Sequence, residues 1–191
     1  MGNEAIVKLL LASRKVDPDA RNKKSETPLW LAVFSGKKNT AKLLLDTNKV
    51  DINVRDKTYG MTPLSLAVRN KDEAIVKLLL DTGKADLNAG DKYGRTPLWA
   101  AVFRGNKAIV KLLLDTGKAD LNAIDKVHRD SPLIVAARHG NVPIAKLLLA
   151  TGKVNLNVKN KYGRTALQVA ALRKDTAFVK LLQRYKLSGR L

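Results

Sequence analysis

The chain has 191 residues, of which 45% are hydrophobic, and its 36 Lys and Arg residues against 17 acids give a formal net charge of +19. That apolar fraction is ordinary for a protein with a buried core. Cysteine is absent, which excludes a disulfide framework, a thiol nucleophile and a cysteine zinc site. The longest aliphatic runs are short and interrupted by Lys, so we expect no membrane association and an intracellular location.

The sequence repeats itself with a period of 34 or 35 residues. Residues 74–89 recur unchanged at 108–123, and a Thr-Pro-Leu motif or a close variant starts at Thr27, Thr62, Thr96, Ser131 and Thr165. A period of this size is typical of small units stacked in an array. We therefore predict one domain over residues 1–191, with a partial unit at about 1–20 and full units at about 21–54, 55–89, 90–123, 124–158 and 159–191.

One unit, residues 91–117, illustrates the predicted local structure. Residues 91–95 favour a turn, in which Asp91 bonds its own backbone and Gly94 accepts a positive φ. Thr96 as N-cap and Pro97 as first residue predict a short helix that Gly105 ends. A second helix is predicted over about 107–116, and it is apolar on most sides. Neither helix is long enough to be stable alone, so neighbouring units must supply the core.

The unit pattern D-x-x-G-x-T-P-L-x-x-A-x-x-x-G-x-x-x-I-V-K-L-L-L-x-x-G-x-A-D-x-N resembles the ankyrin repeat and extends from about residue 4 to 185. The resemblance implies an all-α solenoid of one N-terminal helix plus five helix–turn–helix repeats with β-hairpin-like turns. This 34-residue variant of the repeat resembles the ankyrin tails of filamentous-fungal multidomain proteins. Residues 4–11 correspond to a second helix with no first helix before it, so we expect the chain to begin within a repeat.

The positive charge is uneven along the chain. From residue 131 onward there are twelve Lys or Arg residues and one acid, Asp175, which leaves a net charge of +11. Positions that hold Asp in the earlier units hold Ala150, Asn155 and Asn160 in this segment. Such a field attracts acidic proteins and polyanions.

Motifs for catalysis or metal binding are weak. His128 falls in a turn and His139 near a helix end, with no cysteine and no His-Glu-x-x-His motif beside them, so we expect solvent-facing histidines and no metal site. The Thr-Gly-Lys triplets lack the earlier glycine of a phosphate-binding loop and read as helix ends. We therefore predict no enzyme activity and no cofactor.

Aromatic and basic residues gather at two places in each unit, the turn and the end of the first helix. The family resemblance implies that these places, the turn tips and the concave face of the first helices, bind partners. Exposed aromatic residues beside Arg are typical of binding hot spots, but the Tyr and Phe rings could equally pack on their own repeats. For Trp30 and Trp99 we expect packing near the seam between repeats. The candidate partner-binding residues are Phe34, Lys57, Tyr59, Arg69, Lys92, Tyr93, Arg95, Phe103, Arg104, Arg138, His139, Lys161, Tyr162, Arg164 and Arg173.

Three functions remain open from the sequence. The first is a monomeric, non-catalytic module that binds a protein with an acidic patch. The second is weak, salt-sensitive binding of nucleic acid or another polyanion by the basic C-terminal third. The third is an engineered or consensus-like scaffold without a native ligand, which the unchanged sixteen-residue segment would also suit.

Overall fold

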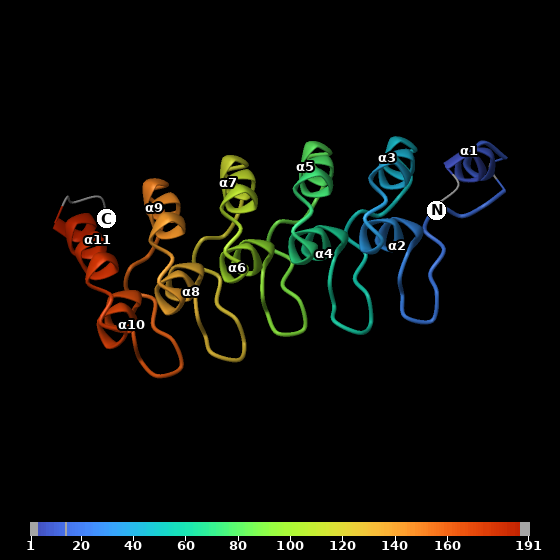
Figure 1. Ribbon diagram of the computed structural model, residues 1–191. Coiled ribbons are helices and arrows are strands. Elements are labelled where there is room, and N and C mark those ends of the chain that lie inside the picture. Colours follow the sequence, from blue (N-terminus) through green and yellow to red (C-terminus); the bar gives the residue numbers. More distant parts are fainter. Residues whose placement is uncertain (1–3, 14, 188–191) are drawn as a thin grey trace. The chain divides into compact units, whose positions relative to one another are not determined.

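The computed structural model describes residues 4–13 and 15–187, and these residues form eleven helices and no β-strand (Figure 1). None of the described helices is long and apolar enough to cross a membrane. The helices are α1 (Glu4–Ser13), α2 (Pro28–Phe34), α3 (Lys38–Asp46), α4 (Pro63–Asn70), α5 (Glu73–Asp81), α6 (Pro97–Phe103), α7 (Lys107–Asp115), α8 (Pro132–His139), α9 (Val142–Ala150), α10 (Ala166–Leu172) and α11 (Thr176–Leu187).

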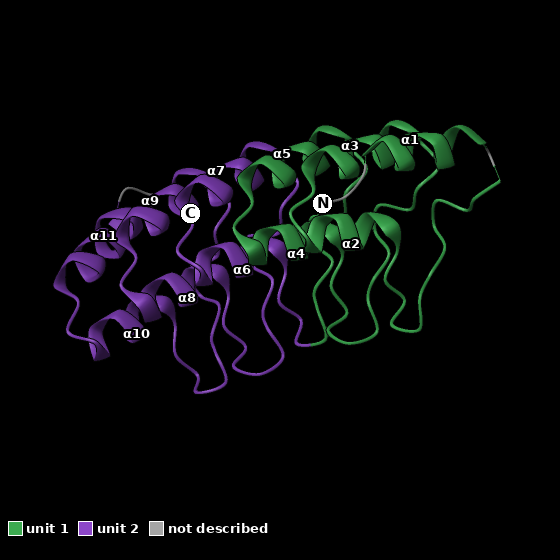
Figure 2. Cartoon of the chain, turned by 45° about the vertical axis from the view of Figure 1, so that its right-hand side comes forward, with its two compact units in different colours: residues 1–92 green, residues 93–191 purple. Residues whose placement is uncertain are grey.

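The chain divides into two compact units, Met1–Lys92 and Tyr93–Leu191 (Figure 2). In the first unit, α2 packs on α4, and α1, α3 and α5 follow one another in a second layer. The second unit has the same construction, with α6, α8 and α10 in one layer and α7, α9 and α11 in the other. The turns that precede the first helices extend from the edge of the first layer (Figure 1).

The first helix of each pair begins at a Thr or Ser cap. The Thr96 side chain accepts a hydrogen bond from the backbone N–H of Trp99, and Pro97 occupies the first helical position, where no N–H is needed. The same arrangement holds at Thr27, Thr62 and Ser131. At Thr165 a capping box with Gln168 replaces the proline. Local chemistry therefore fixes the start of every first helix at the predicted residue.

The second helices supply the most deeply buried side chains. In α7, Ile109, Val110 and Leu113 have no exposed surface, and α5 buries the equivalent Ile75, Val76 and Leu79. Each of these helices ends at a Thr whose hydroxyl donates to a carbonyl one turn earlier, as Thr116 does to Leu113 at 2.6 Å. The helices are nine residues long, so packing between neighbours must stabilise them.

A buried side-chain acceptor organises the turn before a first helix. Asp56 accepts the N–H groups of Tyr59 and Met61, and Asp125 accepts those of Val127, His128 and Asp130. Successive turns within a unit are joined by one backbone hydrogen bond. In unit 1, Lys57 N–H donates to Lys24 O at 2.8 Å and Lys92 N–H donates to Tyr59 O at 2.9 Å. In unit 2, Lys126 N–H donates to Tyr93 O at 2.8 Å and Lys161 N–H donates to His128 O at 2.9 Å.

The all-α fold predicted from the sequence is confirmed, and the second helix predicted at about 107–116 is observed at Lys107–Asp115. The hairpin-like character of the turns stays a prediction, because the described turn residues form no strand. The single-domain assignment and its unit boundaries also stay predictions.

Removal of a buried side chain from α7 tests the stacking directly. We expect Leu113→Ala to lower the free energy of unfolding by about 2–5 kcal/mol, because the change leaves a cavity between stacked helices. Urea denaturation measures the loss. Lys111→Ala, on the exposed side of the same helix, is the control and should change stability little. Equal effects of the two changes would contradict this packing.

Two lysines occupy a backbone conformation that glycine adopts elsewhere. Lys71 and Lys174 have φ values of 58° and 57°, whereas the equivalent Gly105 has 66°. A left-handed conformation costs a residue with a Cβ about 1–2 kcal/mol, and glycine loses part of this advantage through its greater freedom when unfolded. We therefore expect Lys174→Gly to stabilise the fold by about 0.5–1 kcal/mol in thermal unfolding, and Gly105→Lys to destabilise it. A loss of stability in Lys174→Gly would contradict this expectation.

Candidate functional site

Each unit contains a surface pocket at the same place in its repeats. The unit 1 pocket has a volume of about 360 Å³ and is lined by α2, α4 and the turns that precede these two helices. The unit 2 pocket has a volume of about 290 Å³ and lies against α6, α8 and the corresponding turns. Most of their lining residues correspond at a spacing of 69 residues: Lys24 and Tyr93, Glu26 and Arg95, Trp30 and Trp99, Phe34 and Phe103, Asp56 and Asp125, Thr58 and Val127, Tyr59 and His128, Leu66 and Val135, Arg69 and Arg138, and Asn70 and His139.

A stacked pair of aromatic rings forms one wall of each pocket. Trp30 and Phe34 lie one helical turn apart in α2, with ring centroids 5.4 Å apart and planes 12° from parallel. Trp99 and Phe103 in α6 repeat this arrangement at 5.2 Å and 13°. The tryptophans are buried, whereas Phe34 is 60% and Phe103 46% exposed. Each pair therefore presents a phenyl ring to solvent on a rigid indole base.

The indole N–H groups tie each aromatic helix to the repeat that follows it. Trp30 Nε1 donates to the carbonyl of Met61 at 3.2 Å, and Trp99 Nε1 donates to the carbonyl of Asp130 at 3.0 Å. These bonds satisfy both indole N–H groups. They also fix the indole orientation, so the rings offer the pocket their apolar surface alone.

Basic side chains lie beside the aromatic rings in both units. The Arg69 guanidinium lies 5.1 Å from the centroid of the Tyr59 ring. The Arg95 guanidinium lies 4.6 Å from the Tyr93 ring and 5.9 Å from the Trp99 ring. These are cation–π distances. Cationic and aromatic groups are therefore held together on the surface of each unit.

Two buried acids of the turn before α8, Asp125 and Asp130, are engaged by the protein itself, and Asp125 lines the unit 2 pocket. Both Asp125 oxygens accept backbone N–H groups of the turn. Asp130 pairs with the Arg138 guanidinium, and its other carboxylate oxygen and the Arg138 Nε have no hydrogen-bond partner. Arg95, which also lines this pocket, is half-buried, and its guanidinium lies over the Tyr93 and Trp99 rings.

Three side chains of this turn could also contribute atoms to a metal site. Asp125, His128 and Asp130 each bring one ligand atom within 4.8 Å of the others. The sequence predicts no metal site, and this grouping is not evident from it because it depends on how the turn folds. The Asp125 oxygens and one Asp130 oxygen are already used by N–H donors and by Arg138, so a cation would have to displace bonds that hold the turn.

The structure brings some of the predicted binding residues together and leaves others apart. Phe34, Tyr59 and Arg69 line the unit 1 pocket. The unit 2 pocket is lined by five of the predicted residues, which are Tyr93, Arg95, Phe103, Arg138 and His139. A separate group lies at the last turn, where Lys161 and Arg164 lie 5.2 and 5.6 Å from the Tyr162 ring. The remaining predicted residues, Lys57, Lys92, Arg104 and Arg173, are exposed and do not line either pocket.

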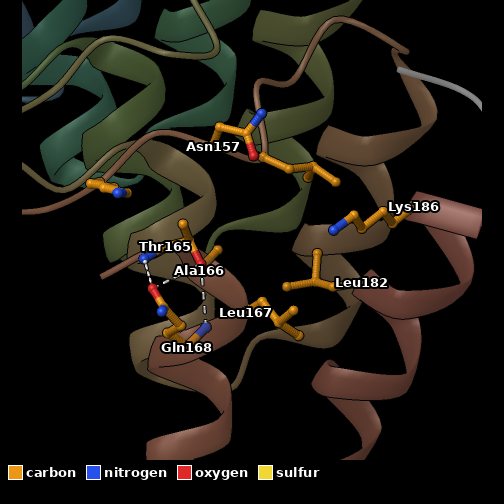
Figure 3. A pocket seen from close by; sticks show the side chains of 9 residues that line it. Asn157, Thr165, Ala166, Leu167, Gln168, Leu182 and Lys186 are labelled. Carbon is orange, nitrogen blue, oxygen red and sulfur yellow. Dashed lines mark hydrogen bonds between the residues drawn. The ribbon is translucent and has the colours of Figure 1, made fainter. Parts of the chain in front are cut away.

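A third pocket, of about 450 Å³, lies between α10, α11 and the segment before α10 (Figure 3). Leu167 and Leu182 form its apolar part, and Lys186 lies at its side (Figure 3). Thr165 and Gln168, which also line it, are hydrogen-bonded to each other in the capping box of α10. No motif in the sequence indicates this pocket.

The 69-residue correspondence was also missed, although its signal is in the sequence. The Thr-Pro-Leu spacings alternate between 35 and 34 residues, and Trp and Phe recur together only in the first and third full repeats. Arg69 and Arg138 stand at the position that Phe34 and Phe103 occupy in the preceding repeat. The first four full repeats therefore alternate between an aromatic and an arginine-bearing type, and the fifth has Gln168 and Leu172 at these positions.

The Arg138–Asp130 pair makes a stability prediction. Arg138→Met leaves the buried Asp130 carboxylate without its cation, and we expect a loss of about 1–3 kcal/mol. This is less than the roughly 3–5 kcal/mol of fully buried pairs, because 38% of the Arg138 side chain is exposed. Adding Asp130→Met, which copies Met61 of the first unit, should recover most of the loss in urea denaturation. Strictly additive losses in the double variant would contradict the pairing.

Comparison with known proteins gives one family. A family model described as ankyrin repeats in three copies matches residues 1–91, 48–125 and 119–188. No curated protein matches the chain.

Proposed function

Since the chain belongs to the ankyrin-repeat family, we propose that it is a non-catalytic module that binds a protein partner with an acidic patch through its turns and first helices. Ankyrin repeats are generally protein–protein interaction modules and typically have no catalytic activity. The identity of the surface and the acidity of the partner are the proposed part. An intracellular location and a monomeric state belong to the same proposal.

One observation carries the proposal: exposed aromatic rings lie beside cationic groups in both units. Large side chains such as Phe34, Tyr59, Tyr93 and Phe103 are at least 43% exposed. Each can bury area on binding without first unfolding the repeat that holds it. Aromatic and Arg residues in such positions supply most of the binding energy in many protein interfaces.

The positive charge supports an acidic partner. With a formal net charge of +19, the chain attracts acidic surfaces, and this attraction mainly raises the association rate. Affinity then depends on the aromatic and Arg contacts made after encounter. The Lys residues repeated along the second helices, such as Lys111 in α7 and Lys146 in α9, are exposed and contribute to the general field.

Nucleic-acid binding is a second candidate, favoured by the last turn. Lys161 and Arg164 flank the exposed Tyr162 ring, an arrangement that can stack a base and contact a phosphate. Residues 131–191 also have the net charge of +11. Binding that rests on phosphate contacts alone falls steeply with salt.

Charge reversal with a matched control tests the proposed surface. Arg104→Glu with Arg173→Glu changes two exposed residues at the ends of α6 and α10, and neither makes an ion pair that stabilises the fold. The control, Lys111→Glu with Lys180→Glu, makes the same charge change on the second helices of the same pairs. We expect the first variant to weaken partner capture by roughly tenfold and the control to weaken it much less.

Circular dichroism should show the same helical signal for both variants as for the unchanged chain. Equal weakening by the two variants would show that net charge alone attracts the partner. Weakening by the control alone would move the binding surface to the second helices and contradict the proposal. A fluorescence-anisotropy titration with a mixed-sequence DNA duplex distinguishes the second candidate, which requires tight binding that survives physiological salt.

A further inference from the structure

We propose that the two units carry equivalent pockets, each of which accepts one bulky apolar side chain flanked by carboxylates, so that one chain binds two copies of a short acidic–hydrophobic motif. This inference rests on the proposed function and specifies the chemistry and number of the segments that are bound. It is carried by the duplication of the pockets, by their apolar walls and by the charge around them.

The duplication extends to the individual contacts. Both pockets have a Trp–Phe stack on the earlier helix, an indole hydrogen bond to the later repeat, and an Arg on the later helix. The intervening repeats lack the Trp–Phe pair, with Ser65 and Ile134 where Trp30 and Trp99 stand. The two pockets are therefore separate sites of the same kind, one in each unit.

The pocket walls select an apolar side chain. Phe103 and Val127 are both nearly half exposed in the unit 2 pocket, and His139 meets the Phe103 ring edge-on at 5.2 Å. The indole of Trp99 cannot donate a further hydrogen bond because Asp130 already accepts from it. A leucine or phenylalanine side chain would bury this surface, and a polar side chain would lose hydration there without a partner.

The charge around the pockets selects carboxylates beside that apolar side chain. In unit 2, the Arg95 guanidinium lies over the Tyr93 and Trp99 rings that line the pocket, and the lining acid Asp125 is buried and bonded to its turn. In unit 1, Arg69 provides the cation, but Glu26 stands where unit 2 has Arg95. We therefore expect the unit 2 pocket to bind an acidic segment more tightly than the unit 1 pocket.

The two tryptophans allow each pocket to be observed separately, because the chain has one in each pocket and no others. The experiment is a two-dimensional ¹H–¹⁵N NMR titration of the full chain that follows the two indole N–H signals. The probe is the peptide acetyl-Glu-Glu-Phe-Glu-Glu-amide. Acetyl-Glu-Glu-Ala-Glu-Glu-amide keeps the charge without the ring, and acetyl-Lys-Lys-Phe-Lys-Lys-amide keeps the ring with the opposite charge. Trp30→Phe assigns the signals.

We expect both indole signals to shift to saturation with the first peptide, with a stoichiometry of two. Either control peptide should cause at most a weak, unsaturated shift. Phe103→Ala should abolish the saturable shift at Trp99 and leave the shift at Trp30, and Phe34→Ala should do the reverse. The matched control is Leu172→Ala, since Leu172 is exposed at the equivalent position of a repeat without a Trp.

Glu26→Arg tests the charge selection within the same titration. The change gives unit 1 the residue that unit 2 has, and we expect it to tighten binding at Trp30 by about two- to tenfold while Trp99 is unaffected. The change removes the hydrogen bond that the Asn22 side-chain amide donates to the Glu26 carboxylate at 2.7 Å. The Asn22 side-chain oxygen still accepts the backbone N–H groups of Lys24 and residue 26, so the turn should keep its shape.

Several results would overturn the inference. These are no saturable shift at either indole, equal shifts with the alanine peptide, or a response to a twelve-base-pair DNA duplex in place of the peptide. Failure here while the Arg104 and Arg173 reversal still weakens partner capture would reject the pockets and leave the proposed function standing. If the titration fails and the Arg104 and Arg173 reversal also leaves partner capture unchanged, the proposed surface is rejected as well.

Discussion

The packing of each second helix between its neighbours is the constraint on which the rest of the structure depends. A helix of nine residues such as α7 is too short to persist alone, and its Ile109, Val110 and Leu113 are buried where α7 packs on α6 and α9 of the same unit. Side-chain and backbone hydrogen bonds then set the register of the stack. Asn53 donates to the carbonyl of Lys84 and accepts from Asp86 N–H, and Asn122 bonds Lys153 and Asn155 in the same way.

Because stacking uses the inner faces of the helices, the ends of the first helices and the turns are free to carry other chemistry. In the first four full repeats, the residues at these positions recur in every second repeat. Trp99 is buried against the next turn and holds Phe103 at the surface, while the following repeat contributes Arg138. A fixed inter-repeat register therefore turns residues from two repeats into one site, and the same register produces the unit 1 pocket.

The elements that the sequence predicts well are those decided within a few residues. Thr96 and Pro97 start a helix whatever surrounds them, and Gly105 ends it with a positive φ. The pockets could not be predicted in this way, since a Trp–Phe stack becomes a pocket wall only through contacts about thirty residues further along the chain. For the same reason the sequence left the exposure of Phe103 open and missed the grouping of Asp125, His128 and Asp130.

The central claim is that partners bind on the aromatic and cationic face of the first helices and turns. Hydroxyl-radical footprinting of the chain, free and bound to a captured partner, measures this most directly because Phe34, Tyr59, Tyr93 and Phe103 are exposed and reactive when free. The account predicts strong protection of these rings and little change on the second helices. Protection confined to the second helices, with these rings as reactive as in the free chain, would contradict it.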